Sequence, residues 1–367
     1  MIAGRILTPA GWITGRVHFT GERITSIEEA SVAGPLRHIL PGFIDLHVHG
    51  AANVDIMAGG DAGSVVARSH ARHGTTAMLG TTMTARIALI EGALQGLAGV
   101  IAARQDGCAR MLGVHLEGPF ISAHRLGAQP PEVMLATLDK VRALHAIAPI
   151  RVLTLAPEIT GHLELIPKLN ELGIRVQLGH SAGSYEDGVA ALNAGAAGFT
   201  HLFNGMTALN HREPGMVGAA LAHAEYAELI PDLQHVHPGA MKAALRAIPK
   251  LYCVSDATAA TGMPDGEYAL GTQRVFKCLG CVRLASGSLA GSALTMDQAL
   301  RNLVSLGLDL ADASNRLSLN PADYLGETER GRLQPGAWAD IVVLDEQLEL
   351  MEVFVEGEAI SLSSPPT

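Results

Sequence analysis

The feature that most constrains this fold is an alternation, repeated eight times, between a short apolar run and a helix-like segment. The runs are rich in aliphatic and β-branched residues, which favours strands; they are Ile44–His49, Thr76–Thr81, Met111–Glu117, Ile150–Pro157, Ile174–His180, Ala197–Leu202, Tyr226–Pro231 and Leu251–Asp256. Between them apolar residues recur at helical spacing, as in Ser64–His73, Ala85–Ala103, Glu132–Ala148, Tyr185–Ala194 and Pro238–Ile248. A long helix is expected from Ser292 to Leu306. Strands alternating with helices form a parallel sheet, and eight repeats predict an α/β fold of the closed (β/α)8 TIM-like barrel type.

The two ends of the chain have a different pattern. Residues 5–27 and 340–360 contain short strand-like runs joined by Gly-rich or polar turns. Neither end has enough apolar residues to form a core of its own. We therefore expect one small β-sandwich domain made from residues 1–41 plus 331–367, and a barrel domain over residues 42–330.

Composition excludes several classes of partner. The formal net charge is -10 and the chain has no basic run, which argues against a nucleic-acid surface. No apolar segment reaches the roughly 18 residues of a membrane span, and the first residues lack the pattern of a secretory signal. Four cysteines are too few for a disulfide framework, and we interpret the isolated pair Cys278 and Cys281 as ordinary buried thiols. We expect a cytoplasmic protein.

Side chains that can bind metal stand at the ends of five predicted strands. They are His47, His49, Glu117, His180, His201 and Asp256. In a barrel of this type the C-terminal strand ends converge on one mouth, where active sites lie. A lone histidine at a strand end is usually a hydrogen-bonded core or rim residue, but six such side chains at one mouth indicate a metal centre. Imidazole and carboxylate ligands suit Zn, Fe, Mn or Ni.

Eight motifs give the chain a resemblance to the N-acetylglucosamine-6-phosphate deacetylases of the amidohydrolase superfamily. They run in family order across nearly the whole chain and begin with Pro41–Gly50, His115–Phe120, Leu178–Ser181 and Thr200–Met206. The others are Arg212–Gly215, His235–Pro238, Ser255–Ala257 and Gly287–Met296. Together these motifs are far more specific than the His-x-His pair, which indicates only the superfamily.

The resemblance implies a role for each matching residue. The principal metal would be held by Glu117, His180 and His201, and a second by His47 and His49, so one or two divalent ions (Zn, Fe, Mn, Ni or Co) are expected. Asp256 matches the catalytic acid and base. Arg212, His235, Asn204 and the backbone of Gly205 match contacts to the sugar phosphate. In the family the arginine comes from the neighbouring subunit, which implies a homodimer.

One position departs from the family pattern. Family members usually carry a histidine that polarises the acetyl carbonyl, and Gln129 stands at the matching place, in His124–Gln129. A glutamine amide can donate a hydrogen bond but cannot become cationic. Three interpretations stay open: Gln129 binds the substrate with a weaker effect, His124 replaces it, or the substrate differs.

The resulting functional hypothesis is metal-dependent hydrolysis of N-acetyl-D-glucosamine 6-phosphate. The fourth predicted strand has no lysine at its end, which disfavours the branch of barrel hydrolases with a carbamylated lysine and leaves Glu117 as the available bridging ligand. Alternative substrates are N-acetylgalactosamine 6-phosphate or another N-acyl compound. A non-catalytic scaffold of the same fold is the remaining alternative, although such proteins tend to lose metal ligands.

Overall fold

The barrel predicted from the sequence is confirmed in the computed structural model, which describes residues 1–32, 34 and 36–362. A parallel sheet has the order β12-β11-β10-β9-β8-β5, formed by Gly198–Phe199, Arg175–Leu178, Ile150–Leu155, Arg110–Glu117, Thr75–Thr82 and Phe43–Asp45. Strands β13 (Glu228–Leu229) and β14 (Tyr252–Cys253) pair in parallel beside it. The Leu202 N–H donates to the Glu228 carbonyl, and the Asp256 N–H donates to the His47 carbonyl, at 2.8 and 3.0 Å. The first bond joins the segment just beyond β12 to β13, the second joins the segments just beyond β14 and β5, and together they close the barrel.

One helix follows each of the eight barrel strands along the chain. In chain order the helices are α1 (Ala62–Ala71), α2 (Ile87–Ala102), α3 (Leu138–Ile147), α4 (Ile166–Asn170), α5 (Tyr185–Asn193), α6 (Gly215–His223), α7 (Pro238–Ala247) and α8 (Met296–Ser305). Two more helices, α9 (Leu310–Leu317) and α10 (Leu319–Leu325), follow α8. Helix α3 begins later than its apolar spacing predicts, because the Thr137 side chain caps it by accepting from the Lys140 N–H.

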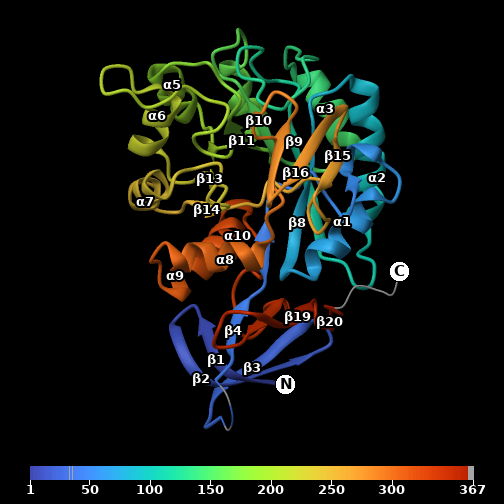
Figure 1. Cartoon of the computed structure of the whole chain (residues 1–367), viewed down its shortest axis with the longest axis vertical. Coiled ribbons are helices and arrows are strands. Elements are labelled where there is room, and N and C mark those ends of the chain that lie inside the picture. The colour runs from blue at the N-terminus through green and yellow to red at the C-terminus, as the bar shows by residue number, and fades with distance from the viewer. Residues whose placement is uncertain (33, 35, 363–367) are drawn as a thin grey trace.

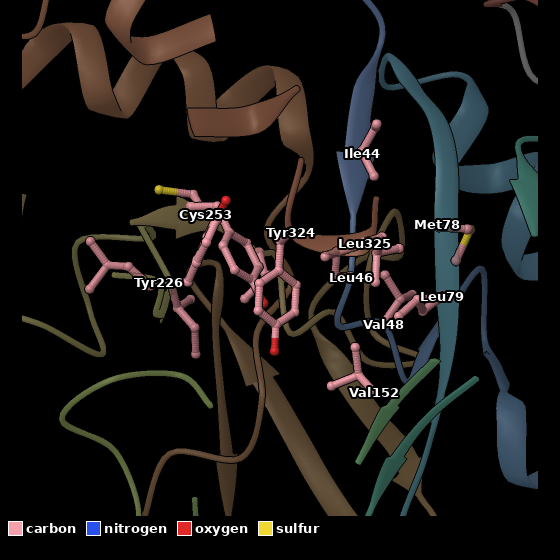
Figure 2. Close-up of a cluster of buried hydrophobic side chains, with 14 of the residues drawn as sticks. Ile44, Leu46, Val48, Met78, Leu79, Val152, Tyr226, Cys253, Tyr324 and Leu325 are labelled. Atoms are coloured by element: carbon pink, nitrogen blue, oxygen red, sulfur yellow. The ribbon is translucent and has the colours of Figure 1, made fainter. Parts of the chain in front are cut away.

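One apolar core fills the barrel and the space beneath its helices. Figure 2 shows part of this core, with Ile44 and Val48 from the first strand region and Met78 from β8. Tyr324 of α10 is fully buried and packs its ring against Tyr226 and Tyr252, at centroid distances of 5.2 and 5.1 Å. The core holds the strand ends in place, so the groups at the barrel mouth rest on a rigid frame.

Strands from both termini form one seven-stranded sheet of order β20-β19-β18-β4-β1-β2-β3. In the same order its strands are Glu358–Ala359, Leu350–Val355, Ile341–Leu344, His38–Pro41, Ile2–Thr8, Gly11–Thr20 and Arg23–Glu29. Figure 1 shows these blue and red strands together at one end of the molecule. The expected pairing of the termini is therefore present, while the division into residues 1–41 plus 331–367 and 42–330 stays a prediction.

A three-stranded antiparallel sheet between β14 and α8 was not predicted. It consists of β15 (Gly266–Leu270), β16 (Gln273–Cys278) and β17 (Cys281–Leu284). The interpretation of Cys278 and Cys281 as buried thiols is wrong, because they flank the turn Leu279-Gly280 that joins β16 to β17, and Cys278 is exposed.

A further short pair of strands, β6 (Gly50–Ala51) and β7 (Val54–Asp55), precedes α1. Among the described residues, the helices are all too short or too polar to cross a membrane.

Candidate metal centre and active site

The six predicted metal-site and catalytic residues lie at, or a few positions beyond, the C-terminal ends of barrel strands. Glu117 is the last residue of β9, whereas His180 and His201 each lie two residues beyond β11 and β12. His180, His201 and Asp256 have φ angles of 46°, 27° and 52°. Left-handed backbone is costly for residues with a Cβ atom and is concentrated at functional sites. These conformations occur just beyond the strand ends, and all three side chains line the same cavity.

One oxygen of Glu117 meets two histidines. Glu117 Oε1 lies 2.9 Å from His201 Nε2 and 3.1 Å from His180 Nε2. The two Nε2 atoms are themselves 3.1 Å apart. The three side chains are buried, so their polar atoms face one another rather than solvent.

The other oxygen of Glu117 meets the remaining pair of histidines. Glu117 Oε2 lies 3.1 Å from His49 Nε2 and 3.5 Å from His47 Nε2. Asp256 Oδ1 lies 3.3 Å from His49 Nε2 and 3.5 Å from His47 Nε2. His47, His49 and Asp256 form a second group with the spacing of metal ligands, and the Glu117 carboxylate stands between the two groups.

The spacing of these donor atoms fits a divalent metal. Four ligands at the Zn–N distance of about 2.0–2.1 Å form a tetrahedron whose edge is roughly 3.3 Å. The Nε2–Nε2 distances of 3.1 Å (His180 to His201) and 3.2 Å (His47 to His49) lie close to that edge. The described residues therefore include His, Asp and Glu groups able to hold a metal ion.

Electrostatics at the cluster favour a bound cation. Burial alone would raise the pKa of Glu117, but His47, His180 and His201 lower it well below its ordinary value. Burial alone would also raise the pKa of Asp256, which His47 and His49 lower to about 2. Conversely, burial lowers the pKa of His49, and Asp256 and Glu117 raise it to about 9. Two ionised carboxylates thus stabilise positive charge on the imidazoles, and a metal ion would replace those protons.

A cavity of about 150 Å³ opens onto the cluster. It is lined by His49, Glu117, His180, His201 and Asp256, and also by the predicted substrate contacts Gln129, Asn204, Gly205 and His235. His235 is held by Asp232, whose Oδ2 accepts from its Nδ1 at 2.7 Å. Burial lowers the pKa of His235, but Asp232 raises it above the ordinary value, which favours a cationic imidazole suited to an anion.

Gln129 reaches the cluster directly. Its Nε2 donates to Glu117 Oε2 at 2.7 Å, and its Oε1 accepts from the Thr84 N–H at 2.7 Å. His124, the alternative considered for the same role, is exposed and lies outside this cavity. Of these two candidates, Gln129 lies beside the residues that could hold a metal ion, and His124 does not.

Arg212 is the predicted site residue that lies apart from the others. It is exposed and lines a neighbouring cavity of about 490 Å³ together with Arg125, Ser184 and Glu213. Within one chain, therefore, Arg212 does not reach the cavity that contains Gln129 and His235.

Sequence analysis missed two buried carboxylates close to the cluster. Glu228 of β13 lies 3.0 Å from His47 Nδ1, and Asp45 of β5 accepts from the backbone N–H groups of His47 and Ser255. Both are fully buried. A charged residue inside an otherwise apolar predicted strand was the available signal, since burial of a carboxylate is costly without partners.

Comparison with known proteins places the chain in a family. The amidohydrolase family matches residues 38–360. The chain is 41% identical to the N-acetylgalactosamine-6-phosphate deacetylase of Escherichia coli O157:H7, with 98% of each chain covered. It is 38% identical to the N-acetylglucosamine-6-phosphate deacetylase of Vibrio furnissii, over 95% of this chain and 88% of that one.

Solved structures agree with the sequence matches. The N-acetylglucosamine-6-phosphate deacetylase of Thermotoga maritima superposes with a TM-score of 0.91 at 30% identity, covering 99% of both chains. A mutant of the Mycobacterium smegmatis enzyme in complex with N-acetyl-D-glucosamine-6-phosphate gives a TM-score of 0.90 at 31% identity over 98% of both chains. This chain therefore belongs to the amidohydrolase family, together with the amino-sugar-phosphate deacetylases that it resembles over nearly their whole length.

Proposed function

We propose that this enzyme hydrolyses the N-acetyl group of N-acetyl-D-glucosamine 6-phosphate, giving glucosamine 6-phosphate and acetate. The observation that carries the proposal is the Glu117 carboxylate, which joins two histidine groups at the end of a cavity that also contains Asp256 and His235. Metal ligands, a proton carrier and a residue suited to an anion thus face one small space. Hydrolysis of an amide in a phosphorylated sugar needs all three.

Two sets of residues would hold the divalent metal. Glu117, His180 and His201 would bind the principal ion, and His47 and His49 would bind a second ion next to Asp256. A bound divalent ion supplies an activated water near neutral pH and polarises the amide carbonyl. The ligand chemistry suits Zn, Fe, Mn, Ni or Co, and one or two ions per subunit.

Asp256 is the proposed proton carrier. Its carboxylate lines the cavity and, with the pKa near 2 noted above, is ionised at neutral pH, so it can accept a proton from the attacking water. The same carboxyl group can then donate that proton to the departing amine. This second transfer matters because an amine is a poor leaving group until it is protonated.

Gln129 and the other polar residues that line the cavity would position the substrate. One N–H of the Gln129 amide donates to Glu117, and the amide nitrogen has a second hydrogen that can donate to the acetyl carbonyl. His235, Asn204 and the Gly205 backbone would bind the phosphate. Arg212 would complete that site from the neighbouring subunit of a homodimer, because its planar guanidinium suits a phosphate and it lies outside the cavity of its own chain.

A second substrate is favoured by one specific observation. The relative that is 41% identical over nearly the full chain is named as an N-acetylgalactosamine-6-phosphate deacetylase. The two sugars differ in the configuration of one hydroxyl group, so the metal, the proton carrier and the phosphate contacts would serve both. We place the enzyme in amino-sugar catabolism in the cytoplasm, where sugar phosphates are found.

The test is acetate release from the 6-phosphates of N-acetylglucosamine and N-acetylgalactosamine, and from the two free sugars. We expect the glucosamine derivative to give the highest kcat/KM and both free sugars to be poor substrates. Arg212→Ala should raise KM strongly for the phosphorylated sugars and little for the free ones. A higher kcat/KM for the galactosamine derivative would favour the second substrate, and equal rates with free sugars would contradict phosphate recognition.

A further inference from the structure

Glu228 is a fully buried carboxylate directly behind the metal ligands, and the mechanism above gives it no role. It lies on β13, the seventh barrel strand, on the side of His47 away from the cavity. Its side chain has no exposed surface. A buried carboxylate is retained only where hydrogen-bond donors surround it, so the identity of its donors indicates its function.

Three donors converge on the two oxygens of Glu228. His47 Nδ1 lies 3.0 Å from Oε2, and the backbone N–H of His201 donates to the same oxygen at 3.2 Å. The Tyr252 hydroxyl donates to Oε1 at 3.3 Å. All three neighbours supply hydrogens, so the carboxylate acts only as an acceptor. One side chain therefore touches a member of each of the two proposed metal-ligand groups.

The contact with His47 decides which ring nitrogen is available to a metal. An accepting carboxylate requires a hydrogen on His47 Nδ1, and in a neutral imidazole this leaves Nε2 without one. His47 Nε2 is the atom that faces His49, Glu117 and Asp256, at 3.2, 3.5 and 3.5 Å. The nitrogen left free by Glu228 is thus the one that points at the proposed metal position.

Glu228 is itself held by a chain of buried hydrogen bonds that crosses the barrel. The chain runs from Tyr252 through Gln177, Thr200 and Thr154 to His115, which contacts the Leu46 carbonyl beside His47. Both ring nitrogens of His115 are already occupied in this chain. His115 is therefore not free to bind an ion with His47 and Glu228, although the three lie within ligand distance of one another.

We propose that Glu228 is a positioning residue, which fixes His47 with its hydrogen on Nδ1 and so keeps Nε2 available as a metal ligand. The carboxylate acts through His47 and does not touch the substrate cavity. Carboxylates that accept from the second nitrogen of a metal-binding histidine typically contribute about 10–100-fold to metal affinity. The proposal rests on the proposed metal-dependent function, because it assumes that His47 binds an ion.

The test is a Zn²⁺ titration of the metal-stripped full-length protein against a competing chelator, with no substrate present. We expect Glu228→Gln to weaken binding of the ion held by His47 about 10–100-fold, because the amide can present an N–H to His47 Nδ1 and favour the other tautomer. Tyr252→Phe is the matched control, since it removes a neighbour of Glu228 without touching His47. This control should retain the wild-type affinity.

A double-mutant cycle separates positioning from general damage to the fold. Glu228→Gln should have no further effect on Zn²⁺ affinity in a His47→Asn background, because its target is already absent. Unchanged affinity in Glu228→Gln, or an equal loss in both backgrounds, would overturn the proposal. Should Glu228→Gln fail to fold, Glu228→Asp shortens the same carboxylate and should give a smaller loss by the same route. Since the readout is metal affinity, a failure of the proposed deacetylase activity would be seen separately, in acetate release.

Discussion

Glu117 is the residue on which the arrangement of the proposed metal site depends. Each of its carboxylate oxygens faces a different pair of histidines, and Gln129 donates to the oxygen on the His49 side. Without Glu117 the two histidine pairs would have no shared negative charge between them. Gln129, the residue that departs from the family pattern, is thus in direct contact with Glu117.

For Asp256, we expect substitution by asparagine to reduce kcat by about 10²–10⁴-fold, the usual contribution of a positioned proton carrier. Asparagine has nearly the same shape but cannot accept the proton. The ion held by Glu117, His180 and His201 should be retained, because none of these ligands changes. Acetate release and metal analysis of the same sample measure both quantities, and turnover close to wild type would disprove the role.

Gln129→Ala tests whether Gln129 supports the acetyl carbonyl. Loss of a donor to a developing oxyanion costs roughly 10²–10³-fold in kcat, so we expect a fall of about that size. His124→Ala is the matched control, since His124 is exposed and outside the cavity. If the His124 variant lost more activity than the Gln129 variant in the same assay, the two roles would have to be exchanged.

The metal-ligand candidates were accessible to sequence analysis, because strand ends of a barrel converge and His, Glu and Asp are recognisable ligands. Glu228 was not found, because its partners His47 and Tyr252 lie 181 and 24 residues away in the chain. Its position inside an apolar run suggested only burial. Contacts across the barrel depend on how neighbouring strands are aligned and on which way each side chain points. The spacing of residues along a single strand does not give this information.

At the scale of elements, the predicted strands and most of their helices agree with the structure, and the insertion β15–β17 does not. Its strands alternate exposed and buried residues weakly, and they lie in a segment to which sequence analysis assigned no element. This insertion contributes to the candidate site, because Leu270, at the end of β15, lines the same cavity as the proposed metal ligands. A segment without a predicted element therefore forms part of the cavity wall.

Leu270→Ala tests the role of that wall. Leu270 is 1% exposed, and truncation of a buried leucine usually costs about 2–5 kcal/mol of stability. We expect KM for the phosphorylated sugar to rise while metal content stays constant, since Leu270 contacts the cavity and is no ligand. Phe276→Ala, at a position on β16 that is 41% exposed, is the control on the same insertion. An unchanged KM in Leu270→Ala would show that Leu270 does not contribute to substrate binding.

At the scale of the whole molecule, buried ion pairs tie the terminal sheet to the barrel. Glu356, next to β19, accepts from Arg110 of β9 at 2.8 and 2.7 Å and from Arg104 at 3.1 Å. Arg330 bridges Glu356 and Asp340. Sequence analysis paired the two termini because neither has enough apolar residues to form a core alone. It could not find this cluster, because its members lie as far apart as residues 104 and 356.

Glu356→Gln should lower the free energy of unfolding by about 3 kcal/mol, because it removes the buried negative charge that Arg104, Arg110 and Arg330 share. Burial raises the pKa of Glu356, but Arg110 and Arg330 lower it from 4.5 to about 2. Because this pKa is lower in the folded protein than in the unfolded chain, ionised Glu356 stabilises the fold at pH values above the ordinary pKa of 4.5. This stabilisation is lost as the pH falls toward 2. The difference between wild type and variant should therefore narrow below about pH 4.5.

Urea unfolding at several pH values measures this difference. Glu352→Gln is the matched control, because Glu352 forms a half-exposed pair with Arg37 and such pairs contribute about 0–1 kcal/mol. An equal loss of stability in the two variants would mean that the buried cluster does not join the sheet to the barrel.

The central claim, a metal-dependent deacetylase built on Glu117 and its four histidines, is tested most directly by one measurement. Acetate release from N-acetyl-D-glucosamine 6-phosphate is followed for the metal-stripped enzyme while Zn²⁺ is added back in known amounts. We predict negligible turnover without metal, and recovery that saturates at one or two bound ions per subunit. Full turnover by the stripped enzyme, or no turnover of this substrate at any metal content, would contradict the claim.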